Sequence, residues 1–287
     1  MAVVRRSLKE VSALNIRIKF KKYGVMKFIG HLDMMRYFQK AIRRADIDIV
    51  YSEGYSPHQV MSFAAPLGVG ITSDGEYFDI EVNSTQSSQS SIDALNRVMV
   101  EGITILEYKR LPDTAKTSMS LVAAADYRVE VKPGYPSFAS SGVEFRKMVQ
   151  EFFQGQSQIC ITKQTKKREI EMDLKPLIYE MKVLEGHNSE LALFLKVCTG
   201  SSDNIKPELV LEAFCQFHRL PFQPQGFQIH RMEVYAKSEE IPVKGEKERQ
   251  EYQKYLNQQK RNYQREGKTF PSFFTLGELG ETIDEPF

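Results

Sequence analysis

The stretch "IRIKFKKYGVMKFIGHLDMMRYFQKAIRRADIDIVYS" (residues 16–52) carries the pattern that decides the fold. Residues 16–24 alternate apolar and basic side chains, which is the period of a half-buried strand. The apolar residues that follow recur at helical spacing, namely Leu32, Met35, Phe38 and Ile42. Residues 47–52 again have the composition of a strand. This stretch therefore predicts a strand, a helix and a second strand.

The same kind of patterning continues to the end of the first half and then repeats. Further strands are predicted at 76–82 and 103–111, with a helix at 90–102 between them, so the order is βαββαβ. The second half repeats this order, with strands at 127–131, 190–197 and 227–236, one or two further strands supplied by 158–162 and 169–185, and helices at 142–154 and 206–220. The sequence predicts an α+β fold of two tandem ferredoxin-like units with antiparallel sheets, plus a charged C-terminal helical tail.

The domain boundaries follow from this repeat. Residues 1–115 form the first unit, 116–237 the second, and 238–287 a charged helical or flexible tail. Residues 244–268 are nearly all charged or amide side chains, which favours a solvated, partly packed helix, with a mobile segment as the alternative. The apolar stretch 270–279 after it could dock on the body or on a partner.

Composition places the chain among soluble globular proteins. Hydrophobic residues make up 41% and charged residues 26% of the 287 positions, and no run of eighteen apolar residues occurs, so no membrane span is expected. The N-terminus has no apolar stretch of the kind found in signal peptides, which favours a cytoplasmic location. The three cysteines, Cys160, Cys198 and Cys215, sit far apart in apolar contexts; we expect buried thiols and no iron–sulfur or zinc cage.

Charge is distributed unevenly along the first unit. Residues 1–50 contain twelve Lys or Arg and four Asp or Glu, whereas residues 51–107 contain one Arg and eight acidic residues. This split predicts a basic face that attracts an anion.

The long loop at residues 53–70, "EGYSPHQVMSFAAPLGVG", contains three glycines, two prolines and a histidine at positions where a plain hairpin needs only two to five turn residues. In a βαββαβ unit this loop and the start of the first helix lie at the same end of the sheet. His31 and His58, the catalytic candidates together with Asp33, are therefore expected to share one edge with Arg36, Tyr55 and Tyr23. Such a set suits a phosphate or a nucleotide. The alternative is structural. Asp33 then only lies in the first helical turn, where the helix dipole favours an acid, His31 caps the same turn, and His58 forms a hydrogen bond within its own loop.

A basic turn, "KQTKKR" (163–168), occupies the matching position of the second unit. Its cationic side chains, Lys163, Lys166, Lys167 and Arg168, predict phosphate contacts, and a charged hairpin tip without a ligand is the alternative.

Residues 23–82 resemble the bacterial radical SAM-linked protein family, a domain of unknown function. The resemblance rests on the pattern F-x-GHLD-x-x-R, then G-[YF]-x-PH-x-x-SFA-x-PL-x-x-G and E-Y-x-D. The residues of this sequence that match the pattern include His31, Asp33, Arg36, Gly54, Pro57, His58, Ser62, Phe63, Pro66, Leu67, Gly70, Glu76 and Asp79. The resemblance implies a radical SAM partner protein, encoded beside this chain or fused to it, and a role connected with RNA or the ribosome. The iron–sulfur cluster, SAM and, where a cobalamin-type domain is present, cobalamin would lie on that partner.

Three functions remain open on the sequence. The first is a non-redox accessory protein that binds ribosomal RNA, transfer RNA or another anionic substrate, with Arg36, Tyr55, Ser62 and the 163–168 turn as binding residues, and with neither DNA nor a membrane as partner. The second is an acid–base enzyme, such as a metal-independent endoribonuclease, that uses His31 and His58. The third is a purely structural adaptor. A metal site of His31, Asp33 and His58 ranks last, because residues two apart on a helix face different ways.

Overall fold

The first half of the chain is built around strand β1 (Leu14–Lys22) and helix α1 (His31–Arg44). The computed structural model describes residues 13–164, 169–185, 191–200 and 203–287. Helix α1 begins after Gly30, whose backbone is extended, and it carries Asp33 in its first turn and two arginines in its last. Both placements stabilise the helix, because acidic groups favour the amino end of its dipole and basic groups the carboxyl end.

Twelve strands and six helices occur in the described residues. The other strands are β2 (Met61–Phe63), β3 (Thr72–Val82), β4 (Ile103–Arg110), β5 (Val122–Val131), β6 (Cys160–Gln164), β7 (Glu169–Asp173), β8 (Ile178–Glu185), β9 (Leu191–Cys198), β10 (Phe227–Lys237), β11 (Phe273–Thr275) and β12 (Glu281–Thr282). The other helices are α2 (Ser88–Val98), α3 (Ser118–Leu121), α4 (Gly142–Phe153), α5 (Pro207–Phe217) and α6 (Glu246–Arg265). An α+β fold is therefore confirmed.

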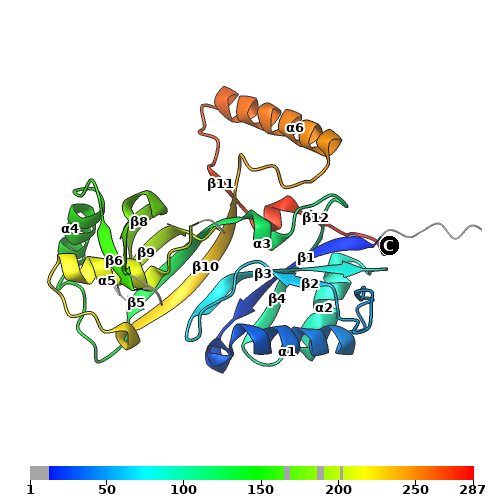
Figure 1. Cartoon of the computed structure of the whole chain (residues 1–287), viewed down its shortest axis with the longest axis horizontal. Coiled ribbons are helices and arrows are strands. Elements are labelled where there is room, and N and C mark those ends of the chain that lie inside the picture. The colour runs from blue at the N-terminus through cyan, green and yellow to red at the C-terminus, as the bar shows by residue number, and fades with distance from the viewer. Residues whose placement is uncertain (1–12, 165–168, 186–190, 201–202) are drawn as a thin grey trace, which may run out of the picture.

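One ten-stranded sheet runs through the molecule (Figure 1). Its order is β12-β4-β1-β3-β10-β5-β9-β8, with β2 on β3 and β11 on β10, while β6 and β7 form a separate hairpin. Each half supplies four strands in an equivalent order, β4-β1-β3-β2 and β10-β5-β9-β8. All pairs are antiparallel except β3 with β10, where the two halves meet. We call this parallel junction, with the side chains that cross it, the seam.

The buried apolar residues form two clusters, one mainly in the first half and one mainly in the second half. The first contains four packed phenylalanines, Phe20, Phe38, Phe63 and Phe78, with ring centroids 4.7–6.2 Å apart. The second is built from β5, α4, β9 and α5, and its aromatic members include Phe145, Phe152 and Phe214. The division of the chain at residues 115 and 237 stays a prediction.

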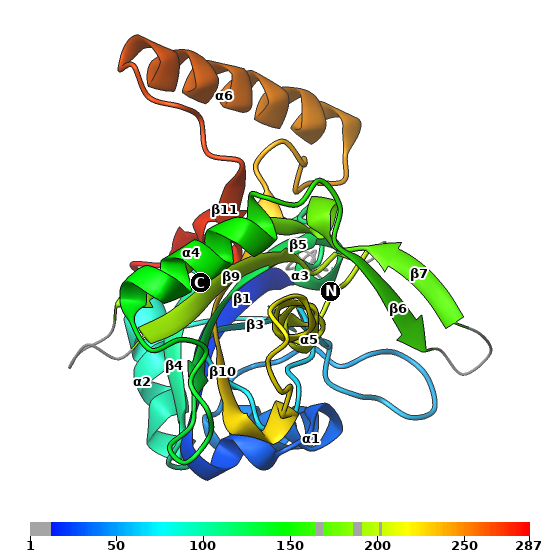
Figure 2. The same ribbon diagram turned by 90° about the vertical axis from the view of Figure 1, so that its left-hand side faces the viewer.

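The C-terminal region differs from the predicted tail. Helix α6 lies apart from the sheet, as Figures 1 and 2 show, but the chain then returns to the body. Strand β11 pairs with β10, and β12 pairs with β4. Leu276 is fully buried in the second hydrophobic cluster and Ile283 is 3% exposed in the first. Of the two alternatives for 270–279, the structure shows docking on the body, where Leu276 and Leu279 pack in the second hydrophobic cluster.

Two local expectations were wrong, the strand at 47–52 and the burial of Cys160. Residues 47–52 form only isolated bridges, Ile49 with Val82 and Tyr51 with Gln59, and the strand lies instead at β2, after the loop tip. On α1 the buried residues are Met34, Phe38, Ala41 and Ile42, which leaves Leu32 67% exposed. Cys160 is exposed, whereas Cys198 and Cys215 are buried. No helix in the described ranges has the length and apolar character needed to cross a bilayer.

Candidate functional site

His31 is the first residue of α1 and lines a small recess of about 20 Å³. Its ring packs edge-on against Phe63, with centroids 5.4 Å apart. The recess is completed by Phe20, Lys22, Met34, Leu67 and Glu76. Burial lowers the pKa of His31 below its ordinary value, and the nearby Glu76 carboxylate only partly opposes this effect. The imidazole is therefore biased toward its neutral form.

The ammonium group of Lys22 lies beneath this recess. Its side chain is 2% exposed, and Nζ donates a hydrogen bond to the carbonyl of Ile29 at 2.7 Å. Burial also lowers the pKa of Lys22, because desolvation disfavours the charged amine. The start of α1 thus combines two titratable groups whose charged forms are both disfavoured by burial.

The structure does not bring His58 to His31. Nδ1 of His58 lies 2.8 Å from Oγ of Ser52, and its backbone N–H donates to the same oxygen, so the histidine closes its own loop. The physical reason is the position of β2, which follows the loop tip instead of preceding it. The segment that reaches the start of α1 is 64–71: Leu67 lines the recess, and the N–H of Gly70 donates to the Lys27 carbonyl at 2.8 Å.

The other predicted site residues are dispersed. Asp33 and Arg36 form an exposed ion pair on α1, 3.1 Å between Oδ1 and NH1. Tyr55 is fully exposed at the loop tip, and Ser62 pairs through its backbone with Asp79. Of the basic turn, residues 165–168, with Lys166, Lys167 and Arg168, lie outside the described residues, and Lys163 is described only as part of the β6 backbone. No group of three or more His, Cys, Asp or Glu in the described ranges is arranged to hold a metal.

Two buried arginines form the ion pairs that sequence reasoning missed. Arg231 on β10 donates to both carboxylate oxygens of Glu76 on β3, from Nε at 2.7 Å, and also to the carbonyl of Ala65. Arg17 on β1 binds Asp79 in the same bidentate way, at 2.8 and 3.0 Å, while Asp79 also accepts from the backbone N–H of Ser118. Both arginines are at most 2% exposed. Glu76 and Asp79, the acids of the E-Y-x-D motif, therefore hold elements together.

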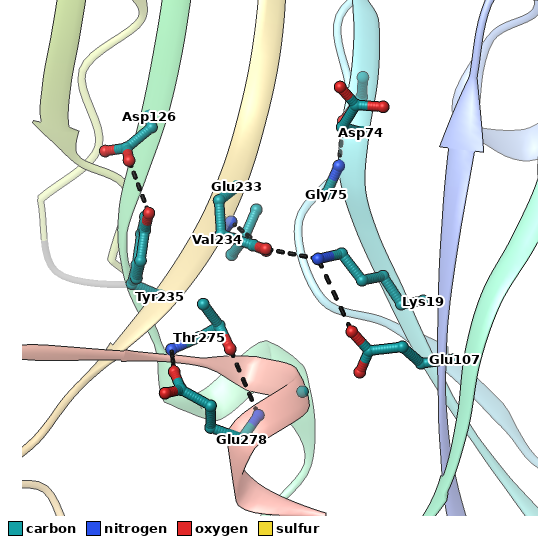
Figure 3. Close-up of polar contacts among 12 residues, drawn as sticks. Lys19, Asp74, Gly75, Glu107, Asp126, Glu233, Val234, Tyr235, Thr275 and Glu278 are labelled. Carbon is teal, nitrogen blue, oxygen red and sulfur yellow. Dashed lines mark hydrogen bonds and ion pairs between the residues drawn. The ribbon is translucent and has the colours of Figure 1, made fainter.

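Lys19 bridges the two halves in a similar way (Figure 3). Its ammonium group lies 2.6 Å from Glu233 on β10 and 3.8 Å from Glu107 on β4. The same ammonium lies 5.5 Å from the centroid of the Tyr77 ring. Burial, with Glu233 as the next contribution, raises the pKa of the Tyr77 hydroxyl far above its ordinary value. This lysine therefore separates two carboxylates that would otherwise repel each other.

A hydroxyl–imidazole–carboxylate chain also crosses the seam. Thr72 Oγ1 lies 2.9 Å from Nδ1 of His230, whose Nε2 lies 3.1 Å from Asp74. Thr72 and His230 are register partners in the parallel ladder, which places their side chains on one face. The Tyr23 ring packs against His230, with centroids 5.5 Å apart and the rings tilted by 41°, and burial together with Asp74 raises the Tyr23 pKa to about 12. His230 and Asp74 are 156 residues apart, and only the pairing of their strands brings these three groups together. No local sequence signal therefore indicates this series of contacts.

The predicted basic face is much smaller than the charge count indicated. The cations of β1 are neutralised inside the sheet, because Arg17, Lys19 and Lys21 pair with acids of β3, β4 and β10. For these three cations the complementary charges therefore reflect paired strands, not a basic face. Exposed cations remain on α1, at Arg36, Lys40, Arg43 and Arg44.

The comparisons with known proteins identify a family but no activity. No curated protein matches the sequence. A solved structure of a Cbf5-Nop10-Gar1 complex is similar over 78% of this chain and 49% of that chain, at 10% identity and a TM-score of 0.40. This chain spans about half of the matched chain, and a likeness at this level carries no argument. A family model described as "Uncharacterized protein conserved in bacteria (DUF2344)" matches residues 15–207. Because this match covers most of the chain, the protein belongs to the DUF2344 family.

Proposed function

We propose that this protein is a non-redox accessory protein, built from two ferredoxin-like units, that binds RNA through the exposed face of α1. We also propose that it works with a radical SAM partner in RNA or ribosome-related modification. The observation that carries the RNA proposal is the row of exposed cations Arg36, Lys40 and Arg43 on one helix. We call these three residues the α1 cation row.

The α1 cation row is arranged to contact a phosphate backbone. Lys40 and Arg43 lie about 6 and about 10 Å beyond Arg36 along the helix axis, so the three charges follow one face over two turns. Among the described residues, Arg36 is engaged only by Asp33, in a pair whose side chains are 71% and 67% exposed. Such pairs contribute little stability in water, so a phosphate can replace Asp33 at small cost.

Exposed aromatic side chains lie on segments at either end of α1. Phe28, in the 3-10 helix η1 (Gly24–Phe28) just before α1, is 62% exposed, and Tyr55 is fully exposed in the loop that follows α1. Unpaired bases stack on such rings without regard to sequence. The segments before and after α1 therefore carry exposed rings in addition to the charges of the α1 cation row.

An exposed apolar patch next to the α1 cation row supports the partner proposal. Val25, Leu32 and Val69 are 76%, 67% and 64% exposed, and Val69 adjoins Gly70, which is bonded to η1. Exposed apolar patches of this kind mark protein contacts. The partner would supply the redox chemistry, as the family resemblance implies.

The partner proposal is tested by capturing proteins with the tagged chain in its own bacterium. We expect a radical SAM protein to be captured by the wild type and lost with Leu32→Asp. Capture that is unaffected by Leu32→Asp would argue against this patch as the contact surface.

The RNA proposal is tested by comparing two triple variants that remove equal charge. Arg36→Gln/Lys40→Gln/Arg43→Gln removes the α1 cation row, and Lys247→Gln/Lys254→Gln/Arg261→Gln removes three exposed cations from α6. We expect fluorescence anisotropy with a labelled single-stranded RNA to show loss of affinity for the first variant only. Equal losses of affinity in both variants would show that RNA responds only to the net charge of the protein. No RNA binding by the wild type would contradict the RNA proposal and favour a purely structural adaptor.

A second candidate, acid–base catalysis, is favoured by the lowered pKa of His31 alone. A neutral imidazole can accept a proton near neutral pH. If the chain cleaves RNA, His31→Asn should abolish turnover while the affinity measured by anisotropy stays unchanged, and His58→Asn should have no effect on turnover. Cleavage that survives His31→Asn rules out this assignment.

A further inference from the structure

Helix α6 covers a cavity that the proposed RNA surface does not use. The helix lies above the sheet and apart from it (Figure 2), and Leu256 is its one buried side chain. A cavity of about 530 Å³ lies between α6 and the segments around β4 and β12. Four side chains of α6 line it, Tyr252, Tyr255, Gln259 and Tyr263, at the spacing of one helical face. This volume lies in the range of ordinary ligand sites.

Five aromatic rings line this cavity. Beyond the three tyrosines of α6, Phe270 and Phe274 come from the returning chain. Tyr263 meets Phe270 edge-on at 5.4 Å, and Phe270 meets Phe274 at 5.7 Å. Lys260 of α6 already lies over the Phe270 ring, at 5.6 Å. The faces of such rings attract cations, because their π electrons are negative there.

The charges around the cavity leave an excess of carboxylate. The two cations in the lining are satisfied within the protein: Arg17 by Asp79, and Lys116 by Glu240 at 3.3 Å. The two acids are Glu278, whose Oε2 accepts from the N–H of Thr275, and Glu281. In the described part of the chain, the Glu281 carboxylate has no ion pair or hydrogen bond.

The cation that pairs with Glu281 in the sheet register is directed elsewhere. Arg110 is the register partner of Glu281 across β12 and β4, so their side chains leave the sheet on the same face. The Arg110 guanidinium, however, lies 4.7 Å from the centroid of the Phe287 ring and 4.0 Å from Asp113. Glu281 therefore remains available at the rim of an aromatic cavity.

We propose that this cavity binds an arginine or lysine side chain of a basic peptide on a partner protein. An aromatic lining with uncompensated carboxylates is the arrangement that recognises organic cations, and the cavity volume of about 530 Å³ lies in the range of ordinary ligand sites. This site is separate from the α1 cation row and has the opposite charge preference. The protein can therefore hold RNA and a basic polypeptide on different surfaces.

The test uses labelled eight-residue peptides of alternating arginine and glycine, or of alternating glutamate and glycine, and measures fluorescence anisotropy with the full chain. We expect saturable binding of the arginine peptide only, weakened about tenfold by Tyr255→Ala and by Glu281→Gln. Two variants serve as matched controls. Tyr51→Ala changes another exposed tyrosine, and Glu251→Gln changes an exposed glutamate of α6 that does not line the cavity.

Both cavity substitutions affect side chains that are largely exposed, so the fold should persist, and a thermal unfolding scan of each variant checks this point. Binding of both peptides alike, equal losses in the control variants, or no binding of the arginine peptide by the wild type would each overturn the proposal. RNA affinity should be the same for Glu281→Gln and the wild type, which separates this site from the proposed RNA surface.

Discussion

The guanidinium of Arg231 and the carboxylate of Glu76 are joined by two hydrogen bonds across the seam, although 155 residues separate them in sequence. Arg231 is 2% and Glu76 4% exposed, so neither charge has water as an alternative partner. Arg231 also donates to the carbonyl of Ala65, in the segment that continues to the recess beside His31. The pair therefore links the second half of the chain to the start of α1.

Breaking this pair should be costly. Arg231→Met leaves the Glu76 carboxylate buried without its partner, and we expect the free energy of unfolding to fall by about 3–5 kcal/mol. The double variant Arg231→Met/Glu76→Leu should lose less than Arg231→Met alone, because no uncompensated charge remains. Urea unfolding measures both, with Arg36→Met in its exposed pair as the control, expected to cost about 1 kcal/mol or less. A double variant as unstable as Arg231→Met would show that the charge is not the cause.

Gly75 marks the closest backbone approach at the seam. A Cβ at this position would lie 2.6 Å from Cα of Glu233 and 2.8 Å from the carbonyl oxygen of Met232, so backbone would have to move. We expect Gly75→Ala to destabilise the protein by about 2 kcal/mol or more, with strongest loss of hydrogen-exchange protection in β3 and β10. Gly30→Ala is the control, because a Cβ there meets no atom within 4 Å. Equal stability of the two variants would contradict the packing described for the seam.

The lowered pKa of His31 predicts a dependence of stability on pH. The unfolded chain titrates near the ordinary value of 6.5, whereas the folded chain takes up this proton only at lower pH. Between these two values the unfolded state binds more protons, so the His31 contribution to stability falls as pH decreases below 6.5 and is constant above it. Urea unfolding at pH 7.5 and pH 5 should show a smaller loss for His31→Asn than for the wild type. An identical loss would show that burial does not suppress protonation here.

The sequence predicted the elements well because their signals are local. Alternation in β1, apolar spacing in α1 and the turn residues around α2 and β4 depend only on neighbouring residues, and these elements lie where they were expected. The strand expected at 47–52 does not form because a strand needs a continuous partner. Residues 47–52 make only isolated bridges, and the continuous partner of β3 on this side is β2.

The candidate site was predicted less well because it depends on contacts between distant segments. His31 lies at the predicted end of α1. The second strand, however, was expected before the loop tip and lies after it, so His58 contacts Ser52 in its own loop and not the recess beside His31. The charge count was misread for the same reason: nothing in the sequence shows that Arg17 and Lys19 would be neutralised by Asp79 and Glu233. Thr72, Asp74 and His230 come together only through the parallel pairing of β3 with β10.

The most direct test of the central claim is the salt dependence of RNA affinity for the wild type and for Arg36→Gln/Lys40→Gln/Arg43→Gln. Each phosphate contact on a single strand contributes about 0.7 to the slope of log affinity against log salt concentration. Removing the α1 cation row should therefore reduce the slope by about 2, and the α6 triple variant should retain the wild-type slope. Identical slopes for the wild type and the α1 variant would contradict the claim that RNA binds along α1.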